Sequence, residues 1–162
     1  LSLHDALPIF KAVQLKCIGE LSKRIASTAA RISLDFNSPD SIAAYYMEQL
    51  RHQEQEIMIC MMLDNQNHLL GDTVLSKGTV NATLITPREV FLEALRYHAV
   101  NLILIHNHPG GNPSPSVCDR EITERISQAG EMLGICLLDH IIIGDQRYVS
   151  FREQGLLDEY PV

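Results

Sequence analysis

The stretch LILIHNHPGGNPSPSVCD, residues 102–119, decides how the rest of the sequence is interpreted. Its apolar run is typical of a buried strand and ends at His106, and a second histidine, His108, follows after one residue. The glycines and prolines after His108 predict a turn, and Ser116 is a good N-cap for a following helix. The stretch therefore predicts a strand, a turn and a helix, with Asp119 in the first helical turn.

His106, His108 and Asp119 together have the chemistry of a metal site. Residues two apart on a strand point to the same face, so both imidazoles can project one way while the turn returns the carboxylate to them. Two imidazoles and one carboxylate suit zinc, and three protein ligands plus water are the pattern of a catalytic centre. The alternatives are histidines that satisfy loop carbonyls, a capping box formed by Ser116 and Asp119, and ordinary turn chemistry.

The remaining sequence alternates between helical and strand patterns, which predicts one α/β domain with a mixed sheet. Gly71 is a candidate for a β-bulge, and Gly144–Asp145 for a hairpin turn. Helices are expected over residues 11–27, 39–53, 86–99 and 116–133. Strands are expected over residues 56–64, 68–80, 81–85, 100–106, 135–144 and 147–151.

Composition narrows the class of protein. The chain has 162 residues, 46% of them hydrophobic, and a formal net charge of −7, which fits one globular domain. An acidic chain is a poor general binder of nucleic acid, because phosphate contacts need Lys and Arg. The four cysteines form no C-x-x-C pair, so we expect reduced thiols in a cytoplasmic protein. No apolar stretch is long enough to span a bilayer, so no membrane partner is expected.

A hydrolytic zinc centre also needs a carboxylate to take a proton from water, and position alone leaves the choice open. Glu89 is already explained by a capping box with Thr86. Glu54 and Glu56 precede a buried strand, and Glu56 is only weakly favoured because it joins that strand directly. The other candidates are expected on solvated helix faces: Glu93, Glu121 and Glu124.

Read as H-x-H-x7-S-x-x-D, the residues His106, His108, Ser116 and Asp119 resemble the JAMM signature of MPN/JAB-domain metalloproteases. The segments TPREVFLEAL, KGTVNATLI and LLDHIIIGDQRYVSFREQGLL resemble, more narrowly, the bacterial RadC-like branch of that superfamily. The resemblance covers roughly residues 38–158. It implies a single MPN/JAB-like (cytidine-deaminase-like) domain, to which we assign residues 36–162.

This resemblance also implies roles for single residues. His106, His108 and Asp119 match the zinc ligands, and Ser116 matches the serine that steadies the tetrahedral intermediate. Glu56 matches the upstream glutamate that acts on the zinc water, which raises it well above Glu54. The implied activity is zinc-dependent hydrolysis of a peptide or isopeptide bond in a peptide or protein substrate.

The N-terminal residues carry two further expectations. Residues 1–9, LSLHDALPI, resemble translated sequencing-adapter sequence, and we expect them to be non-native in a chain that is naturally longer. RadC-like proteins usually carry an N-terminal helix-hairpin-helix region, and residues 10–35 resemble its last helix. Because the hairpin itself is absent, we do not expect this fragment to bind nucleic acid.

Two other functions compete with hydrolysis. The family's traditional name suggests a DNA repair or recombination factor that acts by binding, and some MPN domains are non-catalytic scaffolds that have lost the metal. Nucleobase deaminases are set aside because the chain has no C-x-x-C and has His108 where they have Glu. Asp139 and His140 are expected to form a satisfied core pair rather than to support the metal.

Overall fold

The computed structural model describes residues 9–22, 38–78 and 85–157, and the chain divides into two compact units, residues 1–34 and 35–162. In the first unit, residues 9–22 form a helix, as predicted from residue 11 onward, with exposed side chains. The expectations for residues 1–8 and 23–37 lie outside the described residues. Within the three described ranges, no helix combines the length and the hydropathy that a bilayer crossing requires.

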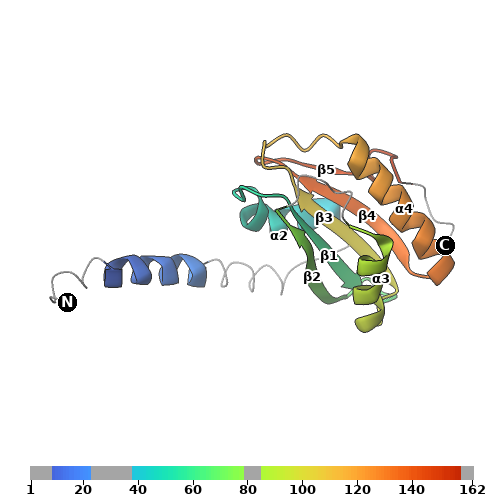
Figure 1. Cartoon of the computed structure of the whole chain (residues 1–162), viewed down its shortest axis with the longest axis horizontal. Coiled ribbons are helices and arrows are strands. Elements are labelled where there is room, and N and C mark those ends of the chain that lie inside the picture. The colour runs from blue at the N-terminus through green and yellow to red at the C-terminus, as the bar shows by residue number, and fades with distance from the viewer. Residues whose placement is uncertain (1–8, 23–37, 79–84, 158–162) are drawn as a thin grey trace. The chain divides into compact units, whose positions relative to one another are not determined.

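The second unit is built on a five-stranded sheet with the strand order β2-β1-β3-β4-β5 (Figure 1). Strands β3 and β4 run parallel, and every other neighbouring pair is antiparallel, so the predicted mixed sheet is confirmed. The strands are β1 (Ile57–Leu63), β2 (Leu69–Lys77), β3 (Asn101–Asn107), β4 (Cys136–Ile143) and β5 (Tyr148–Ser150).

Helices cover both faces of this sheet. The helices among the described residues of this unit are α2 (Pro39–Leu50), α3 (Pro87–Arg96) and α4 (Val117–Leu133). One apolar core lies between the sheet and α2, and the other lies between the sheet and the pair α3 and α4 (Figure 1). The α/β class is therefore confirmed, as three layers with the sheet in the middle.

Strand β1 shows why its sequence is continuously apolar. All seven residues of IMICMML are buried, because both faces of a central strand are covered by helices. Met58 and Met62 enter the core with α3 and α4, whereas Ile59 and Met61 enter the core with α2. This alternation follows from the pleat of the strand, in which successive side chains point to opposite faces.

The antiparallel pairing of β1 with β3 is the feature of the sheet that matters most for the site. Met58 pairs with His106 and Leu63 with Asn101, so the start of β1 lies beside the end of β3. The segment that precedes β1 is thereby brought to the histidines of the opening motif.

Most of the remaining predicted elements are found. The β1–β2 register shifts beside Gly71, where an added Cβ would lie 2.4 Å from Tyr97 Cε1, so a larger residue there would displace the Tyr97 ring. Strands β4 and β5 form the predicted hairpin, in which the Gly144 N–H donates to the Arg147 carbonyl at 2.8 Å. Of the strand predicted over residues 81–85, only Ile85 lies within the described residues.

Candidate metal centre

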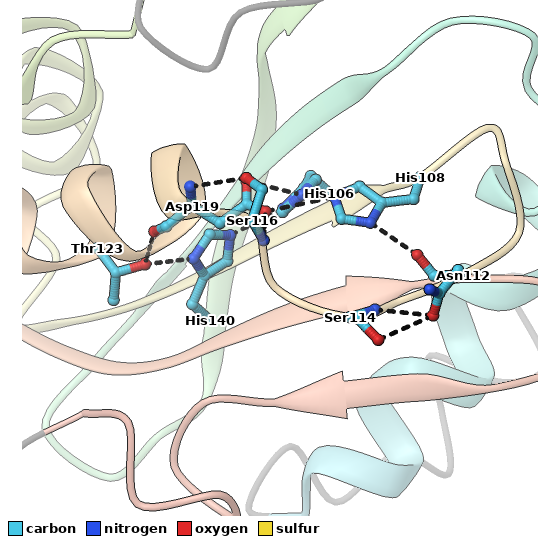
Figure 2. Close-up of polar contacts among 8 residues, drawn as sticks. All are labelled: His106, His108, Asn112, Ser114, Ser116, Asp119, Thr123 and His140. Atoms are coloured by element: carbon cyan, nitrogen blue, oxygen red, sulfur yellow. Dashed lines mark hydrogen bonds and ion pairs between the residues drawn. The ribbon is translucent and has the colours of Figure 1, made fainter.

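The side chains of His106, His108 and Asp119 converge between the end of β3 and the start of α4 (Figure 2). His106 and Asp119 are each 3% exposed, and His108 is partly exposed just beyond the strand. The two Nε2 atoms of His106 and His108 lie 3.0 Å apart. Asp119 Oδ1 lies 3.3 Å from His106 Nε2, and its Oδ2 lies 3.4 Å from His108 Nε2.

Asp119 also belongs to a capping box, so this alternative is true without excluding a metal. The Asp119 N–H donates to Ser116 Oγ at 3.1 Å, and the Ser116 N–H donates to Asp119 Oδ2 at 2.7 Å. These two bonds fix the first turn of α4 and orient the carboxylate toward the histidines. Ser116 itself is exposed, and because its Oγ accepts in this box, its hydroxyl proton stays available to donate.

The electrostatics of the metal-free cluster couple its three members. Burial raises the pKa of the Asp119 carboxyl, but its contacts with His106 and His108 and the hydrogen bond from Ser116 outweigh burial, so the pKa of Asp119 lies well below its usual range. The hydrogen bond with Asp119 raises the pKa of His108 against the opposing effect of burial. The charge of Glu56 raises the same pKa further.

The turn after β3 holds the ring of His108. His108 Nδ1 lies 2.8 Å from the Asn112 carbonyl, and the Asn112 side chain accepts from both the N–H and the hydroxyl of Ser114 (Figure 2). A carbonyl only accepts, so Nδ1 must donate and a neutral His108 presents the lone pair of Nε2. This turn packs closely on the β4–β5 hairpin, since an added Cβ at Gly144 would lie 2.5 Å from the Gly111 carbonyl.

Glu56 lies directly before β1 and is half-buried. Asn107, the last residue of β3, binds the chain on both sides of it. Asn107 Oδ1 accepts from the Ile57 N–H at 2.8 Å, and Asn107 Nδ2 donates to the Gln55 carbonyl at 3.1 Å. The backbone of Glu56 is therefore fixed beside the histidines, and its charge acts on His108. Sequence reasoning did not single out Asn107.

The other glutamates considered from the sequence are engaged elsewhere or exposed. Glu89 closes a capping box with Thr86, whose N–H donates to Glu89 Oε2 at 2.7 Å. Glu93 lies 3.4 Å from Arg96 in an ion pair on α3. Three further carboxylates are exposed: Glu54, Glu121 and Glu124.

The expectation that Asp139 and His140 form a satisfied core pair holds only in part: both are buried, and the His140 N–H donates to Asp139 Oδ1 at 2.7 Å, but the His140 ring has its partners at the candidate metal site. These residues are neighbours on β4, so their side chains point to opposite faces. Asp139 accepts from the Ser150 hydroxyl at 2.6 Å and from the Arg152 N–H at 3.0 Å. His140 instead faces the candidate metal site, and its Nε2 lies 2.9 Å from His106 Nδ1 (Figure 2).

Thr123 completes the cluster and was not predicted. Its Oγ1 lies 2.6 Å from His140 Nδ1 and donates to the Asp119 carbonyl at 2.5 Å (Figure 2). Burial, followed by the charge of His106, lowers the pKa of His140 well below its ordinary value, so this ring is neutral. The sequence held one signal for Thr123: a residue four positions after Asp119 lies on the same helix face.

Comparison with known proteins agrees with the motif. Residues 36–156 match the family described as the RadC-like JAB domain. A UPF0758 protein of Desulfitobacterium hafniense is 44% identical, and the aligned region covers 97% of this chain and 69% of the relative. UPF0758 proteins of Bacillus licheniformis and Syntrophotalea carbinolica are 42% and 40% identical, and each alignment covers 91% of this chain and respectively 66% and 65% of the relative. The chain thus spans about two thirds of these relatives, and it belongs to the RadC-like JAB domain family.

Proposed function

We propose that this domain is a zinc-dependent hydrolase of peptide or isopeptide bonds. The carrying observation is the approach of two imidazole nitrogens and a carboxylate at one strand end, within the family that the comparisons identify. The ligands are His106, His108 and Asp119, whose candidate ligand atoms all lie within 4.8 Å of one another. Glu56 is the proposed general base, and Ser116 the proposed oxyanion donor.

The donor set fits zinc in both chemistry and spacing. Tetrahedral zinc with bonds of about 2.0–2.1 Å places neighbouring ligand atoms about 3.4 Å apart. The corresponding separations are 3.0 Å between the two Nε2 atoms and 3.3 and 3.4 Å from these nitrogens to the Asp119 carboxylate. Three protein ligands leave a fourth position open, which is the arrangement of catalytic rather than structural sites.

Bound there, zinc would supply Lewis acidity toward a substrate carbonyl and would lower the pKa of water. Glu56, fixed at the edge of the site by Asn107, takes the proton of the attacking water and passes it to the leaving amine. The Ser116 hydroxyl, whose oxygen already accepts from the Asp119 N–H, donates its proton to the oxyanion. His108, turned by the Asn112 carbonyl, keeps its Nε2 directed at the site.

The test compares two glutamates that are two residues apart. We expect purified wild-type protein to bind zinc and to cleave members of a peptide and lysine-isopeptide library. Glu56→Gln should retain zinc and lose about 10²-fold or more of the rate, the usual contribution of a general base. Glu54→Gln, at an exposed position, should match wild type in both measurements. His106→Ala should lose zinc.

Two results would contradict the proposal. One is wild-type protein without zinc affinity. The other is zinc-loaded protein in which Glu56→Gln cleaves as fast as wild type.

We propose a cytoplasmic location as well, because four free thiols suit a reducing compartment.

A further inference from the structure

A relay of hydrogen bonds runs through the buried side of the candidate metal centre. It begins at the Asp119 carbonyl, passes through Thr123 Oγ1 and both nitrogens of His140, and ends at His106 Nδ1. The three separations are 2.5, 2.6 and 2.9 Å. Thr123 is 2% exposed and His140 is 0% exposed, so water does not compete for these bonds.

Each proton in this relay can be assigned from the chemistry of its neighbours. The Asp119 carbonyl only accepts, so the single proton of the Thr123 hydroxyl points at it. The Thr123 oxygen must then accept from His140 Nδ1. A neutral imidazole carries one proton, so His140 Nε2 accepts and His106 Nδ1 donates. The proton of His106 is thereby kept on Nδ1.

We propose that Thr123 and His140 are positioning residues of the metal centre, which hold His106 in the tautomer whose Nε2 lone pair faces His108 and Asp119. This inference rests on the zinc centre proposed above. In the opposite tautomer, the proton would lie on Nε2, the atom 3.0 Å from His108 Nε2, and would have to be lost before a metal could bind. By keeping the proton on Nδ1, the relay leaves His106 Nε2 free of a proton that would compete with the metal.

The relay also joins the elements that carry the ligands. His106 lies on β3, Asp119 and Thr123 lie on α4, and His140 on β4 stands between them. Because Thr123 donates to the main chain of Asp119 itself, the position of one ligand is tied to the orientation of another. The ring of His140 also stacks on the ring of Phe151, with the ring centroids 4.9 Å apart.

The experiment uses cobalt as a spectroscopic substitute for zinc and needs no substrate. Thr123→Val keeps the shape of the side chain but removes the hydroxyl. We expect it to weaken cobalt binding by about tenfold or more, which is the usual effect of losing such a partner. Thr123→Ser restores the hydroxyl and should bind within about threefold of wild type. Ile122→Val, a neighbouring buried position on α4, controls for general loss of core packing.

A second measurement tests the proton positions without any substitution. In the intact metal-free protein, ¹⁵N chemical shifts of the imidazoles should report His106 and His140 as Nδ1–H tautomers. A His140 ring protonated on Nε2 would overturn the relay, even if Thr123→Val failed to fold. Equal cobalt affinity of folded Thr123→Val and wild type would overturn it too. Wild-type protein that binds neither cobalt nor zinc would instead refute the metal centre itself.

Discussion

The sharpest stability prediction concerns Asn107, which connects β3 to the segment that carries Glu56. Its side chain is 1% exposed and makes two hydrogen bonds, accepting from the Ile57 N–H at 2.8 Å and donating to the Gln55 carbonyl at 3.1 Å. Asn107→Ala removes both partners at once. The Ile57 N–H, at a residue 7% exposed, is then left without an acceptor.

The two bonds differ in what their loss should cost. A buried N–H without a partner costs about 1–3 kcal/mol, beyond the modest net value of an ordinary hydrogen bond. The Gln55 carbonyl belongs to an exposed residue, so water can replace the lost amide and this bond should contribute little. We therefore expect Asn107→Ala to lower the free energy of unfolding by about 2–3 kcal/mol.

Asn101, at the other end of β3, provides the matched control. Its Nδ2 donates to the Asp64 carbonyl at 3.3 Å and to Asn67 Oδ1 at 2.8 Å, in a partly exposed turn. Asn101→Ala should cost below about 1 kcal/mol, because water can reach both acceptors. Urea unfolding of wild type and both variants measures the difference. Equal losses for the two variants would refute the bridging role of Asn107.

Three further outcomes follow from the geometry of the site. Gly144→Ala should weaken zinc binding in a metal titration, because the added Cβ would lie 2.5 Å from the Gly111 carbonyl and would displace the turn that orients His108. Gly110→Ala is the control: its added Cβ would have no atom within 4 Å, so this variant should bind zinc like wild type. The pKa of His108 in the folded protein is raised above its ordinary value of 6.5. Protonated His108 therefore stabilises the metal-free protein fully below pH 6.5, and this stabilisation is lost as the pH rises through the pKa of the folded protein. Urea unfolding at mildly acidic and alkaline pH should show the loss, and saturating zinc should abolish it, because the metal replaces the proton. Ser116→Ala should cost about 1 kcal/mol in thermal or urea unfolding by removing the N-cap of α4, and an unchanged stability would contradict the capping role.

The parts of this structure that depend on local pattern could be predicted from the sequence. The continuous apolar runs of β1 and β3 indicate strands covered on both faces, and both are buried nearly throughout. The convergence of the candidate ligands could be predicted for the same reason, since a strand, a short turn and an N-capped helix bring His106, His108 and Asp119 together within a few residues of chain. None of these inferences required knowing which strands are neighbours.

The separation of the Asp139 and His140 side chains could have been predicted from the sequence. Adjacent residues on a strand point to opposite faces, so Asp139 and His140 could not have formed a side-chain pair on β4. The alternation alone predicts that one of them enters each core. Which of the two faces carries the metal candidate depends on how α4 packs on the sheet, and that is a long-range property.

The choice of Glu56 over Glu54 shows most clearly what local reasoning lacks. Both residues are carboxylates that precede β1, and their positions in the sequence favour Glu56 only weakly, because it joins the strand directly. The antiparallel register separates them: Met58 pairs with His106, and continuing that register places residue 56 opposite residue 108 and residue 54 opposite the turn beyond it. A slip of one residue would exchange the side chains that enter the two cores, so the packing of the buried apolar residues of β1 and β3 holds this register. The proposed base is thus selected by core packing along the whole length of two strands, with Asn107 fixing its last step.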